Sequence, residues 1–253
     1  MTLAYWWERA APPSPSLLSP NCTIKMFGGS LNRNGITYGG WTLCEPISRG
    51  ADVLSVGIGG DITFDVKVAR KHKANVRCFD PTISQKDFEK MVTRYGASEG
   101  KLRFLPFGLG GINAVLPFYR MQNRTFRGSL TATPNLKGYD KTPYLHAPIL
   151  RMPNLISLVQ PFAPEIVKLD IEGAEWGLFA ETDAEMRRWL ARGPVRQIAI
   201  EFHDRYLPGR AEKRAARHRV VQLLKRCGFH KRHQTPKSGE EVLFVRTRAV
   251  GAC

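Results

Sequence analysis

The sequence predicts an α/β protein with a mostly parallel sheet and helices on both faces. From residue 51 onward, short apolar runs alternate with longer segments of helical periodicity, which is the pattern of βαβ units. Several of these apolar runs end in glycine or in an acidic residue, as expected at the ligand-binding edge of such a sheet. With 43% hydrophobic and 24% charged residues among 253, the composition is that of a globular protein.

The chain divides into a short tail and one domain. Residues 1–21 are rich in Pro and Ser and predict a tail or linker. Residues 22–250 form a single domain, in which 22–50 predict an irregular glycine-rich lead-in. Residues 111–150 interrupt the strand–helix rhythm and predict an insertion with one hairpin. No apolar run reaches the ~18 residues of a spanning helix, so we expect no membrane span.

The predicted elements follow one another in βαβ order. The apolar runs predict strands within residues 51–60, 76–81, 102–111, 165–170, 195–203 and 241–247. Helical spacing predicts helices over residues 62–72, 84–95, 154–159, 176–190 and 211–226. Asp61 is the expected cap of the first helix. Ala216, Val220 and Leu223 are the expected inward face of the last helix.

A glycine-rich turn joins the first strand to the first helix and predicts nucleoside binding. Ser55, Gly57, Gly59, Gly60 and Asp61 make up this turn. Glycines let the backbone approach a ligand closely, and the helix start offers free N–H groups. A dinucleotide fingerprint would need a third glycine at position 62, where the chain has isoleucine. This difference favours S-adenosylmethionine, which has no pyrophosphate, and leaves an NAD-dependent oxidoreductase as an alternative.

Asp80 ends the second strand, 23 residues after Gly57. A carboxylate at this position accepts hydrogen bonds from the ribose hydroxyls of a nucleoside cofactor. The other interpretation is a turn aspartate before Pro81. The glycine turn and the acid together favour nucleoside binding.

Polar side chains gather after the fourth and fifth strands. Asp170, Glu172 and Glu175 surround a glycine, and burying such carboxylates is costly unless they are paired or functional. We interpret Asp170 and Glu172 as functional and Glu175 as a helix-start acid. Glu201 and His203 alternate along the fifth strand and so share one face. His203 is a candidate general base, because its intrinsic pKa suits that role.

Five segments resemble the FkbM-type methyltransferases and the methyltransferase-like proteins related to them. They are V-L-S-V-G-I-G-G-D-I-T-F-D (53–65), V-R-C-F-D-P (76–81), F-G-L-G-G (107–111), V-K-L-D-I-E-G-A-E-W (167–176) and Q-I-A-I-E-F-H (197–203). The resemblance covers roughly residues 22–247. It implies a class I, Rossmann-like fold with a seven-stranded, mostly parallel sheet, S-adenosylmethionine as the methyl donor, and O-methylation.

The resemblance also implies roles for individual residues. The donor would lie across Gly57, Gly59 and Gly60, with its ribose on Asp80. Ser55 stands where many methyltransferases have an acid, and Asp61 would then contact the methionine amino group. Gly108 and Leu109 offer backbone groups to the adenine.

The acceptor would sit over Asp170, Glu172, Glu201 and His203, with Asp170 or His203 taking the proton of a hydroxyl. A divalent cation on Asp170 and Glu172 remains an alternative that we rank below a metal-free site. The acceptor itself, a small molecule or a macromolecule, stays open.

The charge is strongly positive, with a formal net charge of +16. Ten Lys or Arg fall between His203 and His233, against only Asp204 and Glu212. This segment is an alternative nucleic-acid-binding or nucleic-acid-methylating surface. Tyr206 and Phe229 are its only aromatic residues, too few for base stacking, which favours a solvated helix face.

The five cysteines include no CxxC pair, which argues against a zinc cluster. Cys78 and Cys227 stand among apolar residues and are predicted to be buried. A single bridge between Cys22 and Cys44 is an option in an oxidising compartment. The chain shows no charged-then-apolar leader, which favours a cytoplasmic location; a secretory lumen remains the alternative if a leader precedes it.

Overall fold

The structure is a computed structural model, and it describes most of the chain after the predicted tail. The described residues are 22–31, 37–96, 101–122, 130–132, 137–180, 183–236 and 239–248. The tail, residues 1–21, lies outside them.

The central sheet confirms the predicted fold class. Among the described residues it has seven strands in the order β12–β13–β11–β10–β3–β4–β5. Their bounds are β3 (Asp52–Val56), β4 (Asn75–Phe79), β5 (Leu102–Leu105), β10 (Ile166–Leu169), β11 (Gln197–Glu201), β12 (Phe229–Gln234) and β13 (Glu241–Arg246). Only β13 runs antiparallel to its neighbours. If these seven strands are numbered 1 to 7 along the chain, their order across the sheet is 6-7-5-4-1-2-3, which is the order of the class I methyltransferase fold. The sheet is built outward in opposite directions from the neighbouring strands β3 and β10, so the switch point lies between them.

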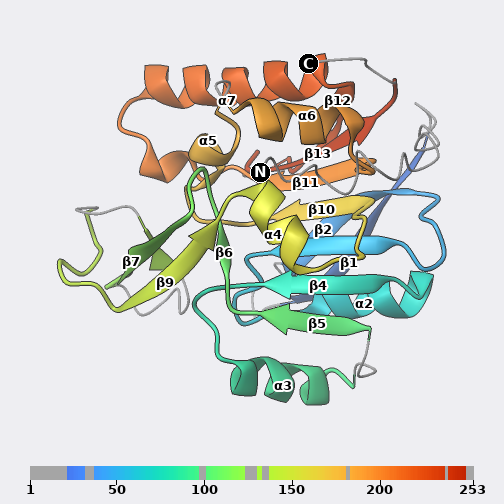
Figure 1. Cartoon of the computed structure of the whole chain (residues 1–253), viewed down its shortest axis with the longest axis horizontal. Helices are drawn as coiled ribbons and strands as arrows, with labels where there is room; N and C mark the ends of the chain where they lie inside the picture. Colours follow the sequence, from blue (N-terminus) through green and yellow to red (C-terminus); the bar gives the residue numbers. More distant parts are fainter. Residues whose placement is uncertain are drawn as a thin grey trace, which may run out of the picture.

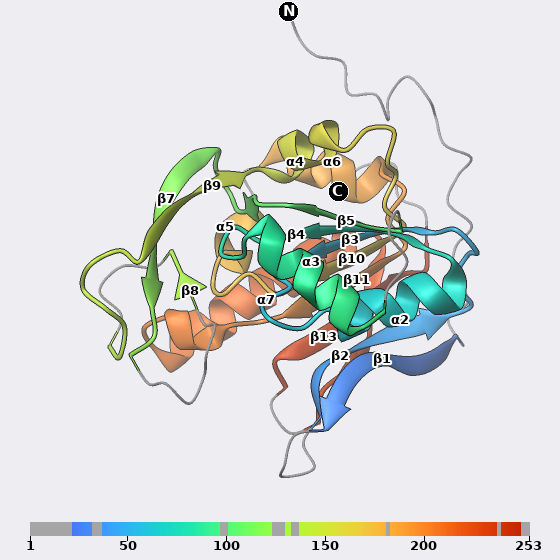
Figure 2. The same cartoon turned by 90° about the horizontal axis from the view of Figure 1, so that it is seen from below.

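Helices cover one face of the sheet, and helices with a hairpin cover the other. Figures 1 and 2 show α4 and α6 on one side and α2 with the β1–β2 hairpin on the other. The bounds are α2 (Thr63–His72), α3 (Gln85–Arg94), α4 (Met152–Leu158), α6 (Ala184–Arg192) and α7 (Arg210–Arg226). One core joins the sheet to α4, α6 and α7, and the other joins it to α2, α3 and the hairpin. Both faces are therefore dry, as a parallel sheet requires.

The predicted irregular lead-in is instead an antiparallel hairpin of β1 (Thr23–Leu31) and β2 (Thr37–Glu45). Gly28 has a φ of 74°, and a Cβ there would overlap the backbone of Phe64. The glycine thus lets the strand pack directly on the start of α2, which a loop-like composition conceals. A disulfide joins Cys22 to Cys44 at the open end of the hairpin.

Two other expectations were wrong in their boundaries. The predicted helix 176–190 is divided into α5 (Glu175–Leu178) and α6, because the Asp183 side chain accepts from the amides of Glu185 and Met186 and starts a new helix. The predicted third strand is divided into β5 and β6 (Gly108–Leu109) at Pro106, which has no amide to donate.

The insertion forms a second, smaller sheet. Its strands are β6, β7 (Ala114–Arg120), β8 (Leu130–Thr131) and β9 (Leu145–Leu150), in the order β6–β9–β7–β8. In Figure 1, β4 and β5 end at the left, and β7 and β9 extend beyond that side. The insertion therefore stands beside the edge at which ligands bind in such folds.

Candidate functional site

The glycine turn crosses the ends of two strands at the point where the strand order reverses. Gly57 has a φ of 75°, and a Cβ on it would overlap the backbone carbonyl of Asp170. Its amide donates to the carbonyl of Phe79 at 2.8 Å. By contrast, a Cβ built at Gly59 or Gly60 meets no atom of the described residues within 4 Å. The turn is thus tightly packed on its inner side and open on its outer side.

The Asp80 side chain holds this turn in place through hydrogen bonds to its backbone amides. One of its carboxylate oxygens accepts from the amides of Ile58 and Gly59 at 3.1 and 2.9 Å. The other accepts from the amide and hydroxyl of Thr82 at 2.8 and 2.6 Å. A carboxylate has about four acceptor positions, so these four bonds use them all. A ribose would have to replace some of these donors to reach Asp80.

The other residues predicted to bind the donor have mainly structural contacts in the protein. Asp61 accepts from the amide of Thr63 at 2.7 Å, but Ile62 and not Asp61 occupies the cap position of α2, because the helix begins at Thr63, one residue later than expected. Ser55 is fully buried inside β3, so its side chain lies away from the open side of the turn. Gly108 and Leu109 are buried in β6, and a Cβ on Gly108 would press on Pro81, the neighbour of Asp80.

Lys168 is a residue of this region that the sequence analysis did not select. It is 4% exposed, and its ammonium donates to the carbonyl of Gly57. The same ammonium lies 3.7 Å from a carboxylate oxygen of Asp170 and 4.8 Å from the ring centroid of Trp41. A lysine inside an otherwise apolar strand was the available signal, because burying an ammonium is costly without such partners.

The predicted acceptor-side residues do converge. The Nε2 atom of His203 lies 3.5 Å from Asp170 Oδ1, 3.7 Å from Glu172 Oε2 and 3.8 Å from Glu201 Oε1. Its Nδ1 atom lies 2.7 Å from the carboxylate of Glu175, which is completely buried. Glu175 does stand in the first turn of α5, but it also orients His203, a role that the sequence analysis missed.

The crowding of acids shifts the ionisation of this cluster. Burial lowers the pKa of His203, but the bond to Glu175 and the charges of Glu172 and Asp170 outweigh it and raise the pKa to about 9. Burial, together with Asp170, raises the pKa of Glu201 to about 8. Burial also raises the pKa of Asp170. His203 is therefore a cation at neutral pH, which makes Asp170 the better proton acceptor of the two.

Glu172 is held in a tight turn by its own partners. It has a φ of 49°, a conformation that costs a non-glycine residue about 1 kcal/mol or more. Its carboxylate accepts from Arg205 at 2.5 Å and from the Tyr206 hydroxyl. Because these partners occupy it, Glu172 fixes the turn between β10 and α5.

The insertion reaches this turn. The hydroxyl of Tyr139 lies 2.9 Å from that of Tyr206, and Thr131 donates to the backbone carbonyl of Glu172 at 2.9 Å. The second sheet therefore borders the cluster of Asp170, Glu201 and His203, as a wall of an acceptor site would.

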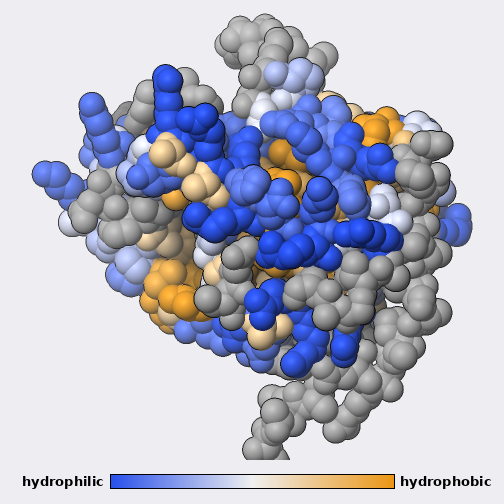
Figure 3. Space-filling model, turned by 90° about the horizontal axis from the view of Figure 1, so that it is seen from above, coloured by the Kyte–Doolittle hydropathy of each residue, from blue (hydrophilic) through white to orange (hydrophobic). Residues whose placement is uncertain are grey.

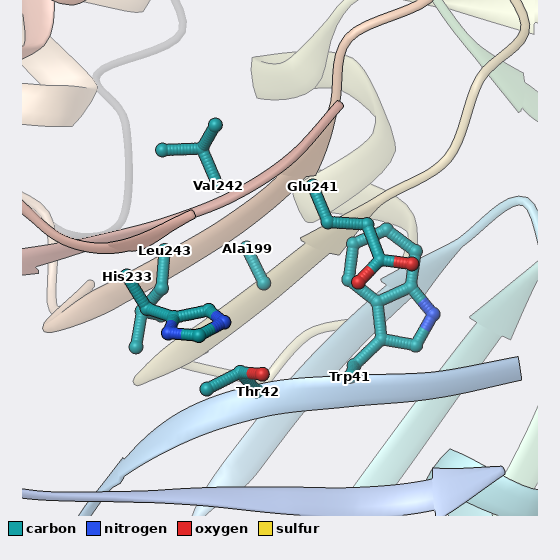
Figure 4. A pocket seen from close by; sticks show the side chains of 7 residues that line it. All are labelled: Trp41, Thr42, Ala199, His233, Glu241, Val242 and Leu243. Carbon is teal, nitrogen blue, oxygen red and sulfur yellow. The ribbon is translucent and has the colours of Figure 1, made fainter. Parts of the chain in front are cut away.

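A small hollow between the hairpin and the sheet is separate from this site. Trp41 and Thr42 of β2 lie across it from Leu243 of β13 and His233 of β12, whereas the Val242 side chain points to the other side of the sheet (Figure 4). Its lining contains neither the glycine turn nor Asp80, so it is not the predicted donor site.

The basic segment lies mainly on α7. The face of the molecule that carries this helix is largely hydrophilic (Figure 3). Ala216, Val220 and Leu223 are buried, as predicted. Arg217 is not simply solvated, because it pairs with Asp204 at 3.1 Å and lies 5.0 Å from the ring centroid of Phe202. Part of the positive charge is therefore structural.

Comparisons with known proteins extend only to the fold. No protein-family model and no curated protein matches the chain. A fibrillarin pre-rRNA processing protein of Methanococcus jannaschii is 10% identical, with a TM-score of 0.42 over 80% of this chain and 69% of that one. A methyltransferase of Pyrococcus furiosus is 11% identical, with a TM-score of 0.33 over 79% and 77%. An O-methyltransferase family protein of Burkholderia thailandensis is 14% identical, with a TM-score of 0.34 over 80% and 52%. The FkbM resemblance is not confirmed by them.

Within the described residues, no helix combines the length and the apolar character needed to cross a bilayer.

Proposed function

We propose that the chain is an S-adenosylmethionine-dependent methyltransferase that acts on a hydroxyl group. The observation that carries this proposal is the contact between the glycine turn and Asp170. Gly57 packs on the backbone of Asp170, so a donor on the turn and an acceptor beside the carboxylate would be neighbours. The topology of the sheet supports the same arrangement.

The donor would occupy the open side of the glycine turn. In the part of the chain that the structure describes, no atom lies within 4 Å of a Cβ at Gly59 or Gly60, which gives a ligand room to approach the backbone. Lys168 holds the Gly57 carbonyl, and Asp80 holds the amides that follow it. These two residues fix the turn, so it pays little ordering entropy when the donor binds.

The chemistry is an in-line displacement at the sulfonium methyl group. The acceptor oxygen forms a bond to the methyl carbon while the carbon–sulfur bond breaks. The electron pair of the broken bond stays on sulfur and neutralises the sulfonium charge. The hydroxyl proton passes to Asp170, whose side chain is 30% exposed beside the turn. Alignment of donor and acceptor supplies much of the rate. His203, as a cation, stabilises the carboxylates around it.

Calorimetric titration tests the donor. We expect the full chain to bind S-adenosylmethionine and S-adenosylhomocysteine, and not NAD. Gly60→Val should fold, because the φ of Gly60 is not positive and an added Cβ meets no atom of the described residues within 4 Å. It should abolish binding, because the valine side chain would occupy the space proposed for the donor. Ser157→Val, on the exposed surface of α4, is the matched control and should bind normally. Unchanged binding by a folded Gly60→Val protein would refute the proposed donor site.

A further inference from the structure

We propose that Asp170, Glu201 and His203 form a binding site for a divalent transition-metal cation. The three residues follow two neighbouring strands, β10 and β11, which pair in parallel and end at the same edge. One ligand atom from each lies within 4.8 Å of the others. This triad differs from the pair Asp170 and Glu172 considered from the sequence, because Glu172 already binds Arg205 and Tyr206.

The spacing of the three ligand atoms is close to that of a coordination sphere. Ligands at about 2.1 Å from a metal lie about 3 Å apart when adjacent and about 4.2 Å apart when opposite. His203 Nε2 lies 3.5 Å from Asp170 Oδ1 and 3.8 Å from Glu201 Oε1, between those limits. Small side-chain rotations would therefore bring all three atoms to one ion.

The orientation of His203 is an independent observation that points to a ligand. The imidazole is 1% exposed, and its Nδ1 atom faces the fully buried carboxylate of Glu175 at 2.7 Å. Metal-binding histidines almost always use the second ring nitrogen in this way, bonded to a carboxylate that fixes the ring. The Nε2 atom is thereby aimed into the group of acids. In the metal-free site a proton on His203 balances these acids, and a dication bound to Nε2 would displace that proton and neutralise more of their charge.

The mixture of ligands selects the metal. Carboxylates and water suit Mg²⁺, Ca²⁺ and Mn²⁺, whereas an imidazole suits Zn²⁺ and similar ions, so a set of two carboxylates and one imidazole can hold Mn²⁺ as well as Zn²⁺. Three protein ligands leave coordination positions open for water or a substrate oxygen. That such an oxygen belongs to the methyl acceptor rests on the proposed function, whereas cation binding itself does not.

Titration of the full chain with Mn²⁺, without S-adenosylmethionine, tests the site. Electron paramagnetic resonance of free Mn²⁺ should show one ion bound per chain. Asp170→Asn and Glu201→Gln, which keep the side-chain volume, should each weaken binding at least about tenfold. Glu175→Gln should weaken it about 10–100-fold, as loss of a carboxylate behind a metal-binding histidine does. A Zn²⁺ titration read by displacement of Mn²⁺ should report the same site.

Glu89→Gln is the matched control. Glu89 is exposed on α3 and is not a member of the triad, so this variant should bind Mn²⁺ as the parent does. No bound Mn²⁺ in the parent, or equal affinity in the parent and the Asp170 and Glu201 variants, would overturn the proposal. Circular dichroism of the same variants reports whether they fold. S-adenosylmethionine titration separates the two proposals, because either ligand could bind without the other.

Discussion

At the scale of single residues, two carboxylates that look alike in the sequence have different environments. Asp80 and Asp170 both follow buried strands, and both were selected as site residues. Asp80 is 5% exposed and bonded to four donors of its own chain, whereas the Asp170 side chain is 30% exposed and faces His203. The residue type and position were predictable from the sequence. The number of hydrogen bonds was not, because it depends on the path of a glycine turn and of Thr82.

Replacing Asp80 by Ala tests whether Asp80 contacts S-adenosylmethionine directly or acts only by holding the glycine turn. Hydrogen bonds to a charged group contribute about 1.5–3 kcal/mol each, so we expect lower stability together with weaker S-adenosylmethionine binding. Denaturant unfolding and calorimetry measure the two effects. Weaker binding with unchanged stability would show that Asp80 touches the ribose itself rather than shaping the turn.

Asp65 on α2 gives a prediction about pH. This side chain is 2% exposed, and burial raises its pKa from 3.8 to about 6. A raised pKa stabilises the folded protein below pH 3.8, and this contribution is lost as the pH rises through 6. A shift of about two units corresponds to ~3 kcal/mol, so Asp65→Asn should stabilise the protein by roughly 2–3 kcal/mol at pH 8 and much less at pH 4.

Unfolding of the parent and Asp65→Asn by urea at pH 4, 6 and 8 measures this difference. Lys168 attracts the charged form of Asp65 and so opposes the effect of burial. A variant that is less stable than the parent at pH 8 would show that this attraction outweighs the cost of burying the carboxylate.

At the scale of elements, the periodicity of apolar residues correctly predicted the long helix α7 and the buried strands of the central sheet. The helix α7 and the strands β3, β4, β10, β11 and β13 lie where apolar spacing placed them, because each buries a regular set of side chains. The strand β12 was missed, since its sequence F-H-K-R-H-Q lacks an apolar alternation at the edge of the sheet. The hairpin was missed for another reason, since its glycines are needed for close packing on α2 and resemble those of a loop.

The basic face of α7 yields a prediction that separates surface from structural charge. Changing Arg210, Lys213 and Arg214 to Glu should leave folding and S-adenosylmethionine binding intact. Arg217→Glu should destabilise the protein, because it would place a carboxylate opposite Asp204. Any RNA binding by the parent should be micromolar or weaker and fall steeply with salt. Tight RNA binding that the triple variant loses would favour a nucleic-acid acceptor.

At the scale of the whole molecule, the hairpin and the glycine turn meet at one lysine, Lys168. The hairpin is closed by the disulfide between Cys22 and Cys44, and Gln197 of β11 binds both the amide and the carbonyl of Cys44 at 2.8 Å. Trp41 of the same hairpin lies over the ammonium of Lys168, which holds the carbonyl of Gly57. No sequence pattern could reveal this chain of contacts, because its members are far apart along the polypeptide.

Through that chain of contacts, donor binding at the glycine turn and closure of the β1–β2 hairpin would be coupled equilibria. If the donor binds only when Lys168 holds the turn, its binding must stabilise the closed hairpin by the same free energy that the closed hairpin adds to donor binding. A Cys22→Ala/Cys44→Ala protein should then bind S-adenosylmethionine more weakly, and the donor should slow hydrogen exchange of the β1 and β2 amides. The hairpin would thus act as a reporter of donor occupancy on a surface that the donor never touches.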